Sequence, residues 1–262
     1  MTILTNGLIA AAGAITFIAG TVGIATAQTV IPNSLENQEG SGNNGLPFNL
    51  SGFSIGSMRY QQVYSASGFS SLSQPSLITE ILFRPDGEFR DGEDVGQAFS
   101  SSLTDIQINL STTTAMPDAL STTFADNVGT DDTVVFGRGS MSLSSLNTRS
   151  DEGPKDFDIS IALETPFLYD PTMGNLLLDI RNFGGGTTTQ FDSQNEVGDS
   201  TSRVLSLGYD SVNNTSGISD STGLVTKFVF DSPPIQSVPE TTGVLSFLVV
   251  AGGIVATSFR QR

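Results

Sequence analysis

The feature that most restricts the fold of this chain is a repeated alternation of apolar and polar residues over short runs. Residues 105–110 and 157–164 alternate in this way, and Leu224, Phe228 and Phe230 share one face of a third run. A period of two places the apolar side chains on one face of a β-strand, so each run predicts a half-buried strand. The alternation therefore indicates a sheet protein.

Turn-forming clusters rich in Gly, Ser, Asn and Asp separate these runs, and no long helical pattern lies between them. Because strands do not alternate with helices, a parallel α/β sheet is disfavoured. We therefore predict an all-β fold, an antiparallel β-sandwich of jelly-roll type over residues 51–232. Further strands are expected at Met58–Tyr64, Leu77–Arg84, Thr133–Arg138, Met141–Leu143, Leu176–Arg181 and Arg203–Tyr209.

Three residue types that carry much of known site chemistry are missing. The 262-residue chain has no His, no Cys and no Trp, and its net charge is −16. The absence of His and Cys excludes His-dependent triads, thiolate nucleophiles and zinc–thiolate sites. The acidic balance argues against nucleic-acid binding, which needs a basic surface to neutralise phosphates. The acidity fits either solubility outside the cell or cation binding.

The N-terminus has the pattern of a secretory signal. Residues 1–27 contain an uncharged apolar stretch, expected to form the signal helix, and end in a small-x-small sequence at 25–27. Leader peptidase cuts after such a sequence, so we expect cleavage between Ala27 and Gln28. No Lys or Arg precedes Arg59, and an uncleaved anchor or a buried helix is the alternative. Residues 28–50 are rich in turn-forming polar residues and are expected to be a flexible linker.

The C-terminus has the pattern of a membrane anchor. Residues 233–262 begin with two prolines and contain an uncharged apolar stretch at 243–259, followed by Arg260 and Arg262. At about 1.5 Å per residue, that stretch is just long enough for a transmembrane helix. The positive-inside rule would keep the arginines in the cytoplasm and the folded domain outside.

Within this tail, Val238-Pro239-Glu240 precedes the apolar stretch and the basic end. The arrangement resembles the PEP-CTERM sorting signal, although Thr241 stands where that family usually has a second proline. The resemblance implies processing by an exosortase-like membrane enzyme. It also implies an exported bacterial protein associated with exopolysaccharide or biofilm. Whether the tail is cleaved or stays as a plain anchor is left open.

One acidic loop is a candidate calcium site. Five carboxylates fall within nine residues that also contain two glycines: Asp86, Glu88, Asp91, Glu93 and Asp94. Oxygen ligands in glycine-rich loops suit Ca²⁺, although the spacing is not that of an EF-hand. Ordinary Asp-Gly turns explain the same residues.

Two further patterns bear on sugars. Tyr60 and Tyr64 are four residues apart, which places both on one face of a predicted strand, as a glycan-stacking platform or as packing residues. Glu80 and Glu164 lie on predicted strands, where a jelly-roll hydrolase could place a carboxylate pair, but the pattern favours solvent-facing strand residues.

No catalytic motif, catalytic residue or cofactor-binding motif follows from these patterns. We expect a non-enzymatic protein displayed on the cell envelope or in exopolysaccharide. Two alternatives are a carbohydrate-binding module and a secreted glycoside hydrolase or lyase that uses a carboxylate pair.

Overall fold

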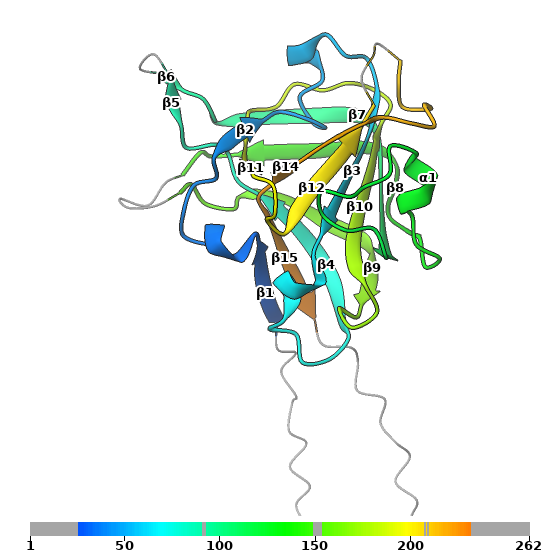
Figure 1. Cartoon of the computed structure of the whole chain (residues 1–262). Helices are drawn as coiled ribbons and strands as arrows, with labels where there is room; N and C mark the ends of the chain where they lie inside the picture. Colours follow the sequence, from blue (N-terminus) through cyan, green and yellow to red (C-terminus); the bar gives the residue numbers. More distant parts are fainter. Residues whose placement is uncertain (1–25, 91–92, 149–153, 207, 209, 232–262) are drawn as a thin grey trace, which may run out of the picture.

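The structure, a computed structural model, describes residues 26–90, 93–148, 154–206, 208 and 210–231 (Figure 1). These residues form strands joined by turns and a few short helical segments, which confirms the predicted all-β class. The helical segments are η1 (Asn33–Leu35), η2 (Ser51–Phe53), η3 (Ala66–Phe69) and α1 (Phe124–Asn127). The strands are β1 (Thr26–Ile31), β2 (Gly42–Asn44), β3 (Met58–Tyr64), β4 (Ser76–Phe83), β5 (Phe89–Arg90), β6 (Glu93–Asp94), β7 (Phe99–Thr113), β8 (Thr133–Ser145), β9 (Ile159–Tyr169), β10 (Asn175–Asn182), β11 (Phe191–Asn195), β12 (Thr201–Leu205), β13 (Ile218–Asp220), β14 (Thr222–Leu224) and β15 (Thr226–Asp231).

All the paired strands are antiparallel, and they form two larger sheets and two small ones. The larger sheets have the orders β1-β15-β4-β9 and β13-β12-β3-β10-β7-β8, and the small ones are β14-β11-β2 and β5-β6. The eight longest strands pair in a nested way along the chain. The first of them, β1, pairs with the last, β15; β3 pairs with β10, β4 with β9, and β7 with β8. Pairings of β15 with β4 and of β10 with β7 join these couples into the two larger sheets.

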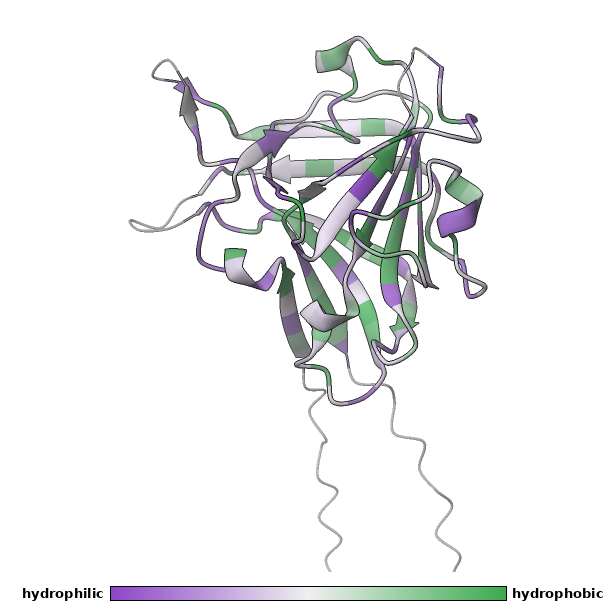
Figure 2. Cartoon of the chain, in the orientation of Figure 1, coloured by the Kyte–Doolittle hydropathy of each residue, from purple (hydrophilic) through white to green (hydrophobic). Residues whose placement is uncertain are grey.

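One hydrophobic core receives side chains from both larger sheets. The alternating residues Ile106 and Ile108 of β7 and Phe228 of β15 are fully buried in the same cluster, as the sequence predicts. Phe69 packs between Tyr169, with ring centroids 4.9 Å apart, and Phe228, at 5.5 Å. Figure 2 shows apolar residues concentrated along the strands of these sheets and polar residues in many of the loops.

The expected flexible linker at 28–50 is wrong, because this segment is part of the folded domain. It contains most of β1, all of η1 and all of β2. Its apolar residues Ile31, Phe48 and Leu50 are fully buried, and Phe48 lies 5.4 Å from the ring of Phe191. A few buried apolar side chains among many turn residues are therefore enough to hold this segment in the fold.

The two ends of the described domain lie side by side. β1 pairs with β15 so that Thr26 is opposite Asp231, and Figure 1 shows β1 beginning and β15 ending at the same end of the domain. Ala27 and Gln28, at the expected cleavage site, are exposed residues of β1. The remainder of the signal segment, the sorting residues Val238, Pro239 and Glu240 and the expected transmembrane helix at 243–259 lie outside the described residues. Among the described residues, no helix combines the length and the apolar character that membrane crossing requires.

Candidate functional site

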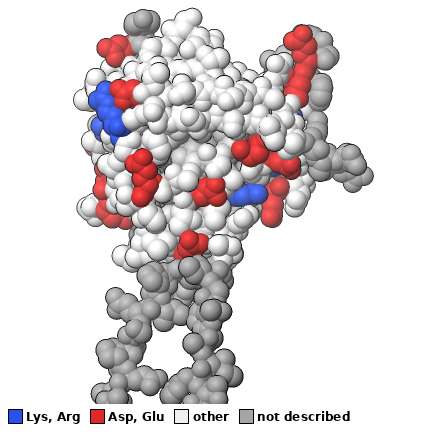
Figure 3. All heavy atoms as spheres, turned by 180° about the vertical axis from the view of Figure 1, so that it is seen from behind, with Lys and Arg blue, Asp and Glu red and all other residues white. Residues whose placement is uncertain are grey.

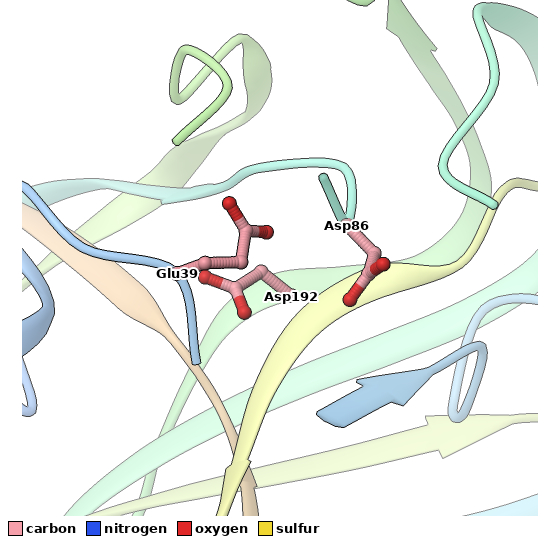
Figure 4. Close-up of side chains that lie close together, drawn as sticks. All are labelled: Glu39, Asp86 and Asp192. Atoms are coloured by element: carbon pink, nitrogen blue, oxygen red, sulfur yellow. The ribbon is translucent and has the colours of Figure 1, made fainter. Parts of the chain in front are cut away.

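Three carboxylates from distant parts of the chain meet beside the small sheet β14-β11-β2 (Figure 4). Glu39 lies between η1 and β2, Asp86 follows β4, and Asp192 belongs to β11; one oxygen of each lies within 4.8 Å of the others. Main-chain hydrogen bonds fix this geometry. The Asp192 amide donates to the Arg84 carbonyl at 3.1 Å, and the Asp86 amide donates to the Gln190 carbonyl at 3.0 Å. The chain after β4 therefore runs beside β11, which brings Asp86 close to Asp192.

Arg84 is the counter-charge inside this cluster. Its side chain is 0% exposed, and its Nε donates to Asp192 Oδ2 at 2.7 Å. Its Nη2 also donates to the carbonyls of Leu35 at 3.0 Å and Gln38 at 2.5 Å. The guanidinium carbon lies 4.8 Å from the centre of the Phe157 ring. Arg84 thus ties the segment before Glu39 to β11, and it satisfies only one of the three carboxylates as an ion-pair partner.

The carboxylate oxygens of Glu39 differ in their partners. Oε1 accepts a hydrogen bond from the Gly87 amide at 2.6 Å. Oε2 is shielded from solvent and has no hydrogen-bond partner among the described residues. A pocket of about 320 Å³ lies against Glu39, Asp86 and the main chain of Gly40 and Gly87. The site therefore combines an unsatisfied anionic oxygen with nearby space.

Burial changes the protonation behaviour of the two aspartates. Burial raises the pKa of the Asp192 carboxyl to about 7; Glu39 adds to the rise, and Arg84 opposes it. Burial also raises the pKa of the Asp86 carboxyl to about 6; the Glu88 amide opposes this rise, while the charges of Glu39 and Glu88 add to it. Both shifts follow from the cost of anions in a poorly solvated site. The cluster can accept protons or a cation.

The described residues of the predicted calcium loop do not form a common site. Of its five residues, only Asp86 belongs to a group of three or more carboxylates among the described residues. Glu88 is exposed and accepts from Asn43 Nδ2 at 2.9 Å, and Asp94 forms an ion pair with buried Lys155 at 2.5 Å. Glu93 is exposed, and Asp91 lies outside the described residues. The described members of the predicted set therefore do not converge, because Asp94 pairs with Lys155 while Asp86 lies beside Glu39 and Asp192.

The proposed glycan-stacking role of Tyr60 and Tyr64 is also wrong. Both side chains are fully buried. The Tyr60 hydroxyl donates to Gln62 Oε1 at 2.6 Å, and the Tyr64 hydroxyl is 2.9 Å from Thr226 Oγ1. The shared strand face was predicted correctly, but in β3 that face points into the protein, and the two tyrosines act as packing residues.

The candidate hydrolytic pair has ordinary strand-surface contacts. Glu80 accepts a hydrogen bond from the Ser160 hydroxyl of the neighbouring strand. Glu164 is exposed on β9 and accepts from the Gly137 amide at 2.8 Å. The first contact links the neighbouring strands β4 and β9 of one sheet, and the second links β9 to β8 of the other larger sheet. Both contacts favour the interpretation as solvent-facing strand residues.

The structure adds two site residues that the sequence did not indicate, Glu39 and Asp192. Glu39 lies in a polar stretch with the composition of a linker, and Asp192 is one polar residue of an unremarkable short strand. No local motif marks either residue, because their meeting depends on the pairing of distant segments. Comparison with known proteins adds no family, since no family model, curated protein or solved structure matches this chain.

Proposed function

We propose that this chain is exported and acts as a non-enzymatic display module at the cell envelope or in exopolysaccharide. The C-terminal segment resembling a PEP-CTERM signal would direct it to an exosortase-like enzyme. The same segment would hold the protein in the membrane at least until processing.

The observation that carries this proposal is the pairing of the two domain ends. Thr26 lies opposite Asp231, so the expected leader cleavage site and the expected tail attach to neighbouring strands. A tether at 232–262 then leaves the same end of the domain as the removed leader. The opposite end, with the β5–β6 hairpin, would face away from the membrane (Figure 1). This placement suits a domain that is presented to its surroundings.

The nested strand pairing supports a jelly-roll arrangement as part of the proposal. First-with-last pairing of eight strands, repeated inward, is what an antiparallel ribbon folded into two sheets produces. Jelly rolls include capsid and lectin domains as well as enzymes, so this topology permits display and does not identify a ligand.

The carboxylate cluster supports a binding or structural role over hydrolysis. Asp86 is 2% exposed and Asp192 is 0% exposed. A glycosidase needs two carboxyl groups on either side of a bound sugar. Acids that lie under the surface cannot flank a polysaccharide, so raised pKa values alone do not favour the enzyme alternative.

The carbohydrate-binding alternative has one specific feature in its favour. A groove of about 600 Å³ is lined by Thr112, Thr113, Asp131 and Met173, among others. It offers hydroxyl groups but no aromatic ring, and Asp131 already accepts a hydrogen bond from the Thr112 amide at 2.7 Å. The face in Figure 3 carries scattered acidic residues and few basic ones, so contact with an anionic polysaccharide would need bridging cations.

Fractionation of producing cells tests the proposal. The full chain should be in the envelope fraction, and a chain truncated after Val238 should be released in soluble form. Changing Pro239 and Glu240 to Ala separates motif-directed processing, which should stop, from plain anchoring, which should not change. A full chain found in the cytoplasm, or a truncated chain still bound to the envelope, would overturn the proposal.

A further inference from the structure

The geometry points to a Ca²⁺ site formed by Glu39, Asp86 and Asp192. This inference is independent of the display proposal, and it places the ion away from the Glu88–Asp94 part of the predicted acidic loop. Three observations carry it: the distances between the carboxylates, the excess of buried negative charge, and one buried oxygen without a partner.

The distances match the size of the ion. One oxygen from each carboxylate lies within 4.8 Å of the other two. Ca²⁺ binds oxygen at about 2.3–2.6 Å, so two ligands on opposite sides of it are separated by about 4.6–5.2 Å. These separations are in the range that one Ca²⁺ shared by the three residues requires. Mg²⁺ needs ligands at about 2.0–2.1 Å in a near-ideal octahedron and gives up its waters reluctantly, so a cluster of three protein carboxylates suits Ca²⁺ better.

When all three carboxyls are ionised, the charges of the cluster do not balance without a cation. Glu39, Asp86 and Asp192 carry three formal negative charges when ionised, and Arg84 supplies one positive charge at Asp192. Asp86 and Asp192 are almost fully buried, where an uncompensated charge is costly. The excess is two negative charges, which one divalent cation neutralises.

Glu39 supplies the observation that points to a ligand. The Gly87 amide holds its Oε1, which fixes the orientation of the carboxylate. Its Oε2 is excluded from solvent and has no hydrogen-bond partner among the described residues. Buried polar atoms are nearly always paired, so this oxygen lacks a partner that a cation would provide. The adjoining pocket of about 320 Å³ leaves room for water molecules to complete the coordination shell.

The chemistry of the donors selects the kind of ion. All three side chains offer hard carboxylate oxygens, and the chain has no His or Cys. Such a set suits Ca²⁺ and disfavours zinc and copper, which take nitrogen and sulfur ligands. Ca²⁺ is also abundant outside cells, where modules bind it with dissociation constants of about 10⁻⁴–10⁻³ M.

Calorimetric titration of the full chain with CaCl₂, in detergent and after treatment with a chelator, tests the site. We expect one site in that affinity range and much weaker binding of Mg²⁺. Glu39→Gln should weaken Ca²⁺ binding at least about tenfold, because affinity follows the charge of the ligands. Glu164→Gln is the matched control, since Glu164 also accepts a glycine amide, and it should bind like the unmodified chain.

Thermal unfolding provides the second readout. Ca²⁺ should raise the melting temperature of the unmodified chain and of Glu164→Gln, but not that of Glu39→Gln. If Glu39→Gln does not fold, Asp86→Asn replaces it, and titration of the unmodified chain needs no variant at all. The absence of binding up to about 10 mM Ca²⁺, well above the affinity range of extracellular modules, would overturn the inference. Equal binding by Glu39→Gln and Glu164→Gln would also overturn it.

Discussion

Replacing Arg84 with Met should lower the free energy of unfolding by about 3–5 kcal/mol at about pH 8.5, above the raised pKa of the Asp192 carboxyl, because Asp192, ionised in the unmodified protein at this pH, loses its buried counter-charge. Arg84 is 0% exposed, and it also donates to the carbonyls of Leu35 and Gln38, which lose these partners in the variant. Met fills much of the same volume and is unbranched, so the loss reports mainly charge and hydrogen bonding.

Urea unfolding followed by circular dichroism measures this loss, since the chain has no Trp for fluorescence. Arg138→Met is the matched control: the Arg138–Asp105 pair is exposed, at 55% and 33%, so its removal should cost far less. Arg84→Met combined with Asp192→Leu should recover part of the loss, because no buried charge then remains unpaired. A loss below about 1 kcal/mol for Arg84→Met, or additive losses in the double variant, would refute the reasoning.

Three other outcomes are expected, two from the structure and one from the sequence. Without divalent ions, the free energy of unfolding should fall as pH rises from about 4.5 to about 7.5, because the folded protein holds protons on Asp86 and Asp192, whose pKa values are raised to about 6 and about 7. The rise in the pKa of the Asp192 carboxyl from the ordinary 3.8 to about 7 corresponds to about 4 kcal/mol of unfolding free energy. Urea titrations that give a flat or rising dependence on pH would contradict this prediction. Phe69→Ala should cost about 3–5 kcal/mol in the same assay, and Phe53→Ala, at a position 48% exposed, much less; equal losses would show that Phe69 is not a core residue. Mass spectrometry of the exported protein should find Gln28 at its N-terminus, and an intact leader would disprove cleavage.

The strand content of the fold could be predicted from the sequence because a half-buried sheet leaves a two-residue period. Ile106 and Ile108 alternate with polar neighbours, and both are buried in β7. The order of strands within the sheets leaves no such local signal. The buried state of Ile31 and Phe48 depends on β15 and β11, which lie far along the chain, so local composition wrongly predicts a linker at 28–50.

The candidate site was less predictable for the same physical reason. A concentration of acids in one loop does not make their oxygens converge: Asp94 pairs with Lys155, whereas Asp86 meets Glu39 and Asp192 from other segments. Alternation places Tyr60 and Tyr64 on one face of β3 but does not say whether another layer covers that face. Only tertiary pairing determines both outcomes.

The display account is tested most directly by chemical labelling of intact cells. The natural chain has no Cys, so a Val197→Cys variant, at a position 78% exposed, carries the only thiol. A membrane-impermeant maleimide should label this variant on intact cells, in the envelope fraction, and truncation after Val238 should move the labelled protein into soluble form. Labelling that occurs only after the cells are broken would contradict export and display.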